Sequence, residues 1–203
     1  MRLIGDRLYL PSANDKQRIE RELVGYLNHG LTAANTYIAG SGNGQVATWF
    51  SVLTGAQRTR LIDELTRMTA ALNNYTVNGR QYARDVQLCH SSGAEMYEEG
   101  LMGAAYAFGV ANVNAHFRLR VYVGMEFRNA AYDDKVQTLV HELSHRIIAT
   151  QDEENAVCSG VDGQKAYGRA NATALAGASP DQALNNADNV AYFVCECSGL
   201  NPP

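Results

Sequence analysis

The clearest hydrophobic pattern in the chain begins after Asp133 and Asp134, where apolar side chains recur at intervals of one, three or four residues. These positions are Val136, Leu139, Val140, Leu143 and Ile147. The spacing puts them on one face of an α-helix, and the two aspartates can provide its N-cap. The pattern therefore predicts an amphipathic helix with one buried face.

Similar patterns predict four further helices, at residues 14–38, 54–72, 167–176 and 183–194. Thr54 is a suitable N-cap for the second of these. Ser179 followed by Pro180 is a strong helix start, because serine caps and proline fits the first helical position. Helices should therefore form most of the chain.

The middle of the chain predicts short strands instead, at residues 85–89, 104–108 and 119–123. Residues 118–124 alternate polar and apolar side chains, which is typical of a sheet with one exposed face. The predicted fold class is therefore α+β, mainly helical with a small sheet.

The length of 203 residues suits one substantial core, and no linker-like stretch divides the chain. We predict one domain over residues 1–203, with a helical part at 1–80 and the candidate chemistry in 81–203. The net charge is −4 and no basic stripe is present, which argues against a nucleic-acid surface.

No apolar run is long enough to cross a membrane. Residues 1–10 contain charges and no continuous apolar segment, so they do not match a classical signal peptide. The sequence thus predicts a cytosolic product, a mature or excised domain, or a protein secreted or delivered without a classical N-terminal signal peptide.

Four cysteines are present: Cys89, Cys158, Cys195 and Cys197. The last two are too close for a relaxed bridge with each other on a helix. Buried thiols or one or two disulfides are favoured over a thiolate zinc site.

Candidate chemistry lies on the first helix described above, where residues 141–145 read His-Glu-Leu-Ser-His. Positions four apart share one helix face, so His141 and His145 can bind one Zn²⁺. Glu142 then projects toward a metal-bound water as a general base. The pattern predicts hydrolysis by a metal-activated water.

A catalytic zinc usually takes three protein ligands, so a third ligand should follow. No histidine follows His145, which excludes the motif with a third histidine. The acids that could complete the site are Asp152, Glu153, Glu154, Asp162, Asp188 and Glu196. Of these, Glu196 stands out because a later helix can supply such a glutamate.

Further segments are similar to a known family. Residues 149–152 read Ala-Thr-Gln-Asp and residues 167–168 read Tyr-Gly, like the two halves of Gly-Thr-x-Asp-x-x-Tyr-Gly. Residues 121–124 and 183–189 are also similar to segments of this family. In this respect the chain resembles the aspzincins, which include deuterolysin and the fungal lysine-specific metalloendopeptidases, over residues 81–197.

The resemblance implies a zincin-like metalloprotease fold and a role for particular residues. Asp152 would be the third zinc ligand, and Tyr167 would assist catalysis. The edge of the strand carrying Val121 and Val123 would bind an extended peptide beside the histidine helix, although an ordinary inner strand fits its pattern equally well. Asp188 would either favour Lys or Arg at P1′ or orient a zinc histidine.

Three positions depart from the family pattern. Ala149 replaces a glycine, which suggests a less strained turn. Asp152 and Tyr167 are 15 residues apart, whereas the matching Asp and Tyr are three residues apart in the motif, and this leaves Asp162 as a rival ligand. Ala191 occupies the place of a second acid in the lysine-specific branch, so a basic P1′ preference should be graded.

We therefore predict a zinc-dependent endopeptidase acting on a polypeptide substrate, with neither nucleic acid nor a membrane as partner. Two alternatives are a toxin-type effector protease delivered into other cells, with an immunity or inhibitor protein as partner, and a catalytically inactive zincin-like binding module. The intact Glu142 argues against the inactive module.

Overall fold

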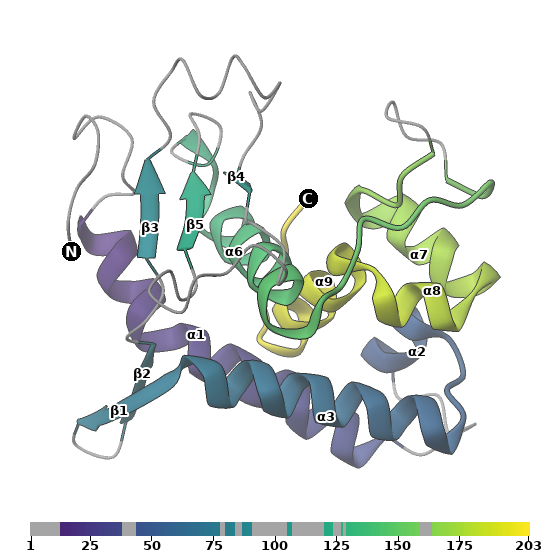
Figure 1. The fold of residues 1–203 in the computed structure, drawn as a ribbon, viewed down its shortest axis with the longest axis horizontal. Coiled ribbons are helices and arrows are strands. Elements are labelled where there is room, and N and C mark those ends of the chain that lie inside the picture. The colour runs from purple at the N-terminus through teal and green to yellow at the C-terminus, as the bar shows by residue number, and fades with distance from the viewer. Residues whose placement is uncertain are drawn as a thin grey trace.

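The structure is a computed structural model (Figure 1). It describes residues 13–37, 44–77, 80–83, 87–90, 105–106, 120–123, 127, 129–158 and 164–203. The helices of this part are α1 (Ala13–Thr36), α2 (Gly44–Phe50), α3 (Gly55–Leu72), α6 (Tyr132–Ile148), α7 (Gly168–Ala178), α8 (Pro180–Asn185) and α9 (Ala187–Cys197). The strands are β1 (Asn73–Val77), β2 (Arg80–Ala83), β3 (Gln87–His90), β4 (Ala105–Tyr106) and β5 (Arg120–Val123).

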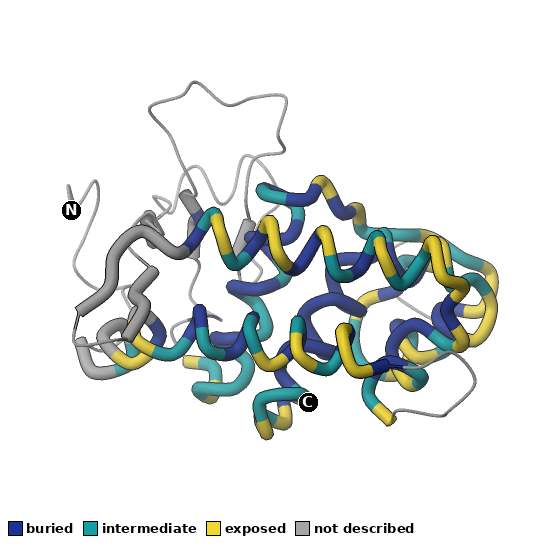
Figure 2. Tube along the Cα trace, turned by 90° about the horizontal axis from the view of Figure 1, so that it is seen from below, coloured by how far each residue is buried: buried dark blue, intermediate teal, exposed yellow. Residues whose placement is uncertain are grey.

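The helices pack around α9, which lies against α1, α2, α6 and α7. Figure 1 shows the long helices α1 and α3 along one side of the molecule, with α6 crossing above them. Along these helices, buried and exposed residues alternate in Figure 2, as expected for amphipathic helices. The largest buried side chains include Trp49, Phe50 and Phe193.

The apolar face predicted for the histidine helix is confirmed in α6. Val136, Leu139, Val140 and Leu143 are fully buried. The N-cap prediction is wrong, because Ala131 is the N-cap and makes no side-chain cap hydrogen bond. Asp133 and Asp134 lie in the first turn instead, where their negative charge still favours the helix dipole.

The predicted fold class is wrong for the described residues. Helices form their packed core, and the strands are short segments of two to five residues. The predicted edge strand is also wrong, because β5 is the middle strand between β3 and β4. β5 pairs in parallel with β3 and antiparallel with β4. Along these paired residues, strands of the chain itself therefore occupy both sides of β5.

Two helix features were not predicted. The short helix α2 lies between the helices predicted at 14–38 and 54–72 and was not expected from the pattern. The single helix expected at 183–194 is divided, because Asn186 has an extended backbone (ψ 126°) between α8 and α9. The predicted caps at Thr54 and Ser179 are confirmed, since each side-chain oxygen accepts the main-chain N–H of the residue three positions later.

The turn after α6 is strained, which corrects the expectation drawn from Ala149. Its φ of 62° and ψ of 33° lie in the left-handed region, where a Cβ costs about 1–2 kcal/mol. Glycine is the usual residue at this position of a helix end. The chain therefore has an alanine in a backbone conformation that favours glycine.

Ala149→Gly should accordingly raise the free energy of unfolding by about 0.5–1 kcal/mol, because relief of the strain exceeds the ~0.4–1 kcal/mol cost of glycine's freedom in the unfolded chain. Urea denaturation of both proteins measures this difference. A lower stability of the glycine variant would contradict the strained turn.

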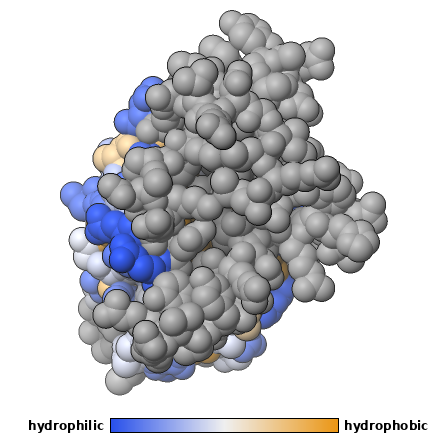
Figure 3. Space-filling view, turned by 90° about the vertical axis from the view of Figure 1, so that its left-hand side faces the viewer, coloured by the Kyte–Doolittle hydropathy of each residue, from blue (hydrophilic) through white to orange (hydrophobic). Residues whose placement is uncertain are grey.

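Cys158, Cys195 and Cys197 are free thiols, and the side chain of Cys89 lies outside the described residues. Within the described part, no helix combines the length and the apolar character needed to span a membrane. On the face shown in Figure 3, the described residues that reach the surface are mostly hydrophilic.

Candidate metal centre

Two imidazole rings meet on one face of α6. His141 and His145 are one turn apart, and their Nε2 atoms are 3.0 Å from each other. The ring planes are perpendicular, with centroids 4.7 Å apart. Both side chains are largely buried, with 13% and 16% exposure. The helix thus aims two nitrogen atoms at one point, as the spacing predicted.

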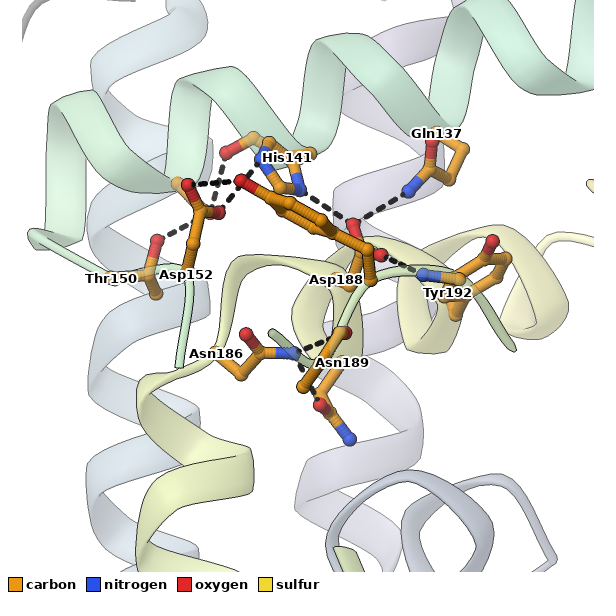
Figure 4. Close-up of polar contacts among 12 residues, drawn as sticks. Gln137, His141, Thr150, Asp152, Asn186, Asp188, Asn189 and Tyr192 are labelled. Atoms are coloured by element: carbon orange, nitrogen blue, oxygen red, sulfur yellow. Dashed lines mark hydrogen bonds and ion pairs between the residues drawn. The ribbon is translucent and has the colours of Figure 1, made fainter. Parts of the chain in front are cut away.

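Asp152 brings a carboxylate to the same point from the segment that follows α6. Its Oδ1 atom lies 3.3 Å from Nε2 of His141 and 3.2 Å from Nε2 of His145 (Figure 4). This oxygen is buried and has no hydrogen-bond partner. The three side chains form a group that could hold a metal ion.

The other ring nitrogens show which atoms of this group carry protons. Nδ1 of His145 lies 2.8 Å from the carbonyl oxygen of Thr150, and a carbonyl can only accept, so Nδ1 donates. Nδ1 of His141 likewise lies 2.6 Å from Oδ1 of Asp188. Each neutral ring therefore presents an unprotonated Nε2. Together with Oδ1 of Asp152, three electron-rich atoms face one another.

Three such atoms repel each other unless a cation lies between them. Tetrahedral zinc bonds of about 2.0–2.2 Å would put neighbouring ligand atoms about 3.3–3.5 Å apart. The observed separations of 3.0, 3.2 and 3.3 Å are close to this. Two imidazoles, one carboxylate and an open fourth position also match the donor set of catalytic zinc, so the residues present fit this ion.

The electrostatics of His141 favour positive charge at this point. Burial disfavours the charged ring, but the carboxylates of Asp152 and Asp188 outweigh it and raise the pKa of His141 to about 10. The pKa of Asp152 is lowered: burial would raise it, but the close contacts of its carboxylate with the rings of His141 and His145 outweigh burial. The site thus stabilises a cation more strongly than an ordinary pair of histidines would.

Asp188 holds His141 from the side opposite Asp152 (Figure 4). Its Oδ1 also accepts a hydrogen bond from Nε2 of Gln137 at 3.1 Å, and its Oδ2 accepts the main-chain N–H of Gly168 at 2.6 Å. Gly168 has a φ of 76°, a conformation in which glycine has no Cβ penalty. Three donors therefore fix this buried carboxylate.

Thr150 holds His145 in a corresponding way. Its hydroxyl lies 2.7 Å from that of Ser144, which itself donates to the carbonyl oxygen of His141 at 2.6 Å. Thr150 and Ser144 are both buried. This pair fixes the turn that presents the Thr150 carbonyl to His145.

Glu142 and Tyr167 lie on the rim of the same group. Glu142 is buried, and its negative charge acts on both His141 and Tyr167. Tyr167 is 39% exposed and donates its hydroxyl to Oδ2 of Asp152 at 2.9 Å. Burial, followed by the charge of Asp152, raises the pKa of Tyr167 well above its usual value, so the hydroxyl keeps its proton.

The long interval between Asp152 and Tyr167 forms an excursion whose two ends meet. The N–H of Ala166 donates to the carbonyl oxygen of Glu153, and the N–H of Asn155 donates to that of Gln164. Glu154 and Lys165 also form an antiparallel bridge. The extra residues therefore return the chain to its starting point, and Tyr167 reaches Asp152 despite the insertion.

The other sequence candidates lie elsewhere. Glu196 contacts the guanidinium of Arg169 and accepts the indole N–H of Trp49 at 2.8 Å, so it is not part of the group. Asp162 lies outside the described residues, as does the side chain of Val123. Val121 is fully buried in the core, which removes its side chain from substrate contact.

Sequence reasoning missed Gln137, Thr150 and Gly168 as partners of the site. Gln137 is one turn before His141 on α6, so its place on the same helix face was readable from the spacing. Thr150 and Gly168 contact the site through a main-chain carbonyl and a main-chain N–H, so their residue types did not reveal these contacts although both match the motif.

The sequence model of the family described as "Lysine-specific metallo-endopeptidase" matches residues 35–195. The chain belongs to this aspzincin family of zinc metalloendopeptidases. Zinc is the metal of this family, in agreement with the donor set described above. The match begins at residue 35, so it includes helices of the part predicted at residues 1–80.

Two relatives add detail. The fold is similar to that of a solved zinc peptidase from Grifola frondosa, with a TM-score of 0.64, 22% identity, and coverage of 91% of this chain and 96% of that one. An extracellular protease from Aeromonas hydrophila is 40% identical over 78 residues. That match covers 36% of this chain and 19% of the relative, so the chain matches about a fifth of that protease's length.

Proposed function

We propose that this aspzincin is a zinc-dependent endopeptidase whose metal is held by His141, His145 and Asp152. The observation that carries the proposal is the meeting of three potential ligand atoms, Nε2 of each histidine and Oδ1 of Asp152, with this oxygen buried and without a hydrogen-bond partner. A group of this kind is costly to bury without a cation, and family membership identifies the cation as zinc.

In this proposal, Glu142 transfers the protons and Tyr167 stabilises the developing negative charge. When bound, zinc supplies Lewis-acid activation of water and of the scissile carbonyl. Glu142 takes the proton of the attacking water and passes it to the leaving amine. Tyr167 donates its hydroxyl to the carbonyl oxygen as negative charge develops there, and its raised pKa keeps that proton available.

Removal of the metal tests the function directly. The purified protein should contain one zinc per chain and digest casein, and a chelator should abolish digestion because the water is then not activated and only Tyr167 remains to polarise the carbonyl. Added zinc should restore activity in proportion to the metal bound. Undiminished digestion by metal-free protein would contradict the proposal.

Asp188 orients His141 and keeps its Nε2 directed at the metal. Its hydrogen bond to Nδ1 supports this role, because an outer carboxylate of this kind fixes both the tautomer and the orientation of a zinc histidine. A graded preference for Lys or Arg at P1′ depends on the same carboxylate. Among the described residues, its Oδ2 accepts a hydrogen bond from the main-chain N–H of Gly168, and it can accept a second one.

Asp188→Asn separates these two roles. Loss of the orienting charge should weaken zinc binding by about 10–100-fold, measured by competition with a chelator. A peptide library should show cleavage before Lys or Arg enriched in the wild type and the enrichment lost in the variant. Unchanged zinc affinity would contradict the orienting role, and a purely apolar P1′ preference in the wild type would contradict the specificity.

We further propose that the substrate is a polypeptide outside the producing cell, since the Aeromonas relative is named as an extracellular protease. The effector interpretation, with an immunity protein as partner, stays a prediction from the sequence. The inactive module is not favoured, because Glu142 and the three ligand candidates lie together.

A further inference from the structure

Asn186 has an unusual place for a buried polar residue. It is the N-cap of α9, yet its side chain makes no capping hydrogen bond. An asparagine at this position normally accepts an N–H from the first turn of its helix. Asn186 is only 1% exposed, so its amide must find other partners.

Those partners lie at both ends of the excursion between Asp152 and Tyr167. Oδ1 of Asn186 accepts the main-chain N–H of Glu153 at 3.1 Å, and Nδ2 donates to the carbonyl oxygen of Ala166 at 3.3 Å. One amide therefore bonds the residue after Asp152 and the residue before Tyr167.

The main chain beside Asn186 holds Asp152 from its other side. The N–H of Gln151 donates to the carbonyl oxygen of Asn185 at 2.7 Å, and the N–H of Ala187 donates to the carbonyl oxygen of Gln151 at 3.0 Å. Asp152 thus sits between two residues that are each bonded to the junction of α8 and α9. The side chains of Asn185 and Gln182 also donate to the carboxylate of Glu153, whereas the amide of Asn186 accepts the main-chain N–H of that residue.

We propose that Asn186 is a positioning residue that sets the Asp152 carboxylate and the Tyr167 hydroxyl against each other across the inserted segment. The inference rests on the proposed function, because it assigns these two groups to the zinc and to the developing negative charge. Asn186 acts through its neighbours and contacts neither metal nor substrate. It also explains how the site keeps its geometry with a much longer segment than the family motif contains.

Asn189 provides a matched control on the same helix. It is fully buried and also makes three hydrogen bonds, to the side chain of Asn186 and to the carbonyl oxygens of Trp49 and Ala172. The bonds to Trp49 and Ala172 do not reach the segments beside Asp152 or Tyr167, and loss of the Asn189 acceptor should leave the bonds between Asn186 and the main chain of Glu153 and Ala166 in place. Loss of either asparagine should lower the melting temperature, but only loss of Asn186 should disturb the site.

The test compares Asn186→Ser and Asn189→Ser with the wild type. Serine is a good N-cap, so α9 keeps its start while the reach to Glu153 and Ala166 is lost. For Asn186→Ser we expect zinc affinity or kcat to fall by about 10–100-fold, as for other outer partners of metal ligands, with KM little changed. For Asn189→Ser both quantities should stay within about threefold of the wild type at a similar loss of stability.

Equal losses of zinc affinity or kcat in the two variants would overturn the inference, and so would unchanged zinc affinity and kcat in Asn186→Ser. The proposed function would still stand in either case if the wild type binds zinc and is active. If Asn186→Ser does not fold, Asn186→Asp replaces it. A double-mutant cycle combines Asn186→Ser with Tyr167→Phe. If Asn186 acts on kcat through Tyr167, Asn186→Ser should lower kcat markedly less in the Tyr167→Phe background. Fully additive losses of kcat, with unchanged zinc affinity, would also overturn it.

Discussion

Glu142→Gln is expected to lose about 10²–10⁴-fold in kcat, which is the usual contribution of a general base, while zinc content stays at one ion per chain. Glutamine has nearly the same shape, but its amide cannot take a proton from water. The fold should persist, since Glu142 lies on the buried side of a helix whose core contacts come from its apolar residues.

The measurement is steady-state hydrolysis of a peptide substrate by protein of known zinc content. Glu154→Gln is the matched control, because Glu154 is an exposed glutamate close to the site in sequence and its side chain has no part in the proposed chemistry. The control should keep wild-type kcat. Near-normal turnover by Glu142→Gln would show that another group takes the proton.

The parts of the site that the sequence predicted are those fixed by local geometry. His141 and His145 meet because the helical repeat puts positions four apart on one face, and the apolar spacing of α6 settles which face is buried. The choice of Asp152 as the third ligand depended on the resemblance, since five other acids were candidates. Its position in the structure agrees with that choice, although the ligand role itself is still a proposal.

The parts that escaped prediction depend on contacts between distant segments. The hydrogen bond from His141 to Asp188 joins residues 47 positions apart, and no pattern in one sequence specifies such a pairing. The two roles weighed for Asp188 could not be separated without knowing its donors. Likewise, capping statistics assign Asn186 to the start of α9, whereas its amide bonds two other segments.

The errors in the fold have a similar origin. Alternating polar and apolar residues indicate a half-exposed strand but do not say which strands pair on either side, so β5 was placed at an edge when it lies in the middle. The break at Asn186 was not predicted because the apolar residues of 183–194 keep helical spacing across it. Ala149 was misjudged because a residue's identity does not determine its φ when the helix end and the metal segment already fix the turn.

Asp152→Ala is expected to have the second large effect, a loss of zinc affinity greater than the ~10–100-fold that follows from changing an outer partner. Alanine removes one of three ligand atoms and leaves two imidazoles, which is fewer than the three protein ligands of a catalytic zinc site. The lost charge also matters, because the Asp152 carboxylate contributes to the raised pKa of His141.

Zinc titration against a chromophoric chelator measures the affinity, and circular dichroism checks the fold. Glu196→Ala and Asp162→Ala are the controls, since these acids were the rival ligands in the sequence. Glu196→Ala should lower the melting temperature, because Arg169 and Trp49 lose their acceptor, but zinc affinity should stay at the wild-type value. If instead Glu196→Ala or Asp162→Ala released the metal while Asp152→Ala retained it, the three-atom group on α6 and its following turn would not be the zinc site. The selective loss in Asp152→Ala would tie the unpartnered Oδ1 atom to the metal.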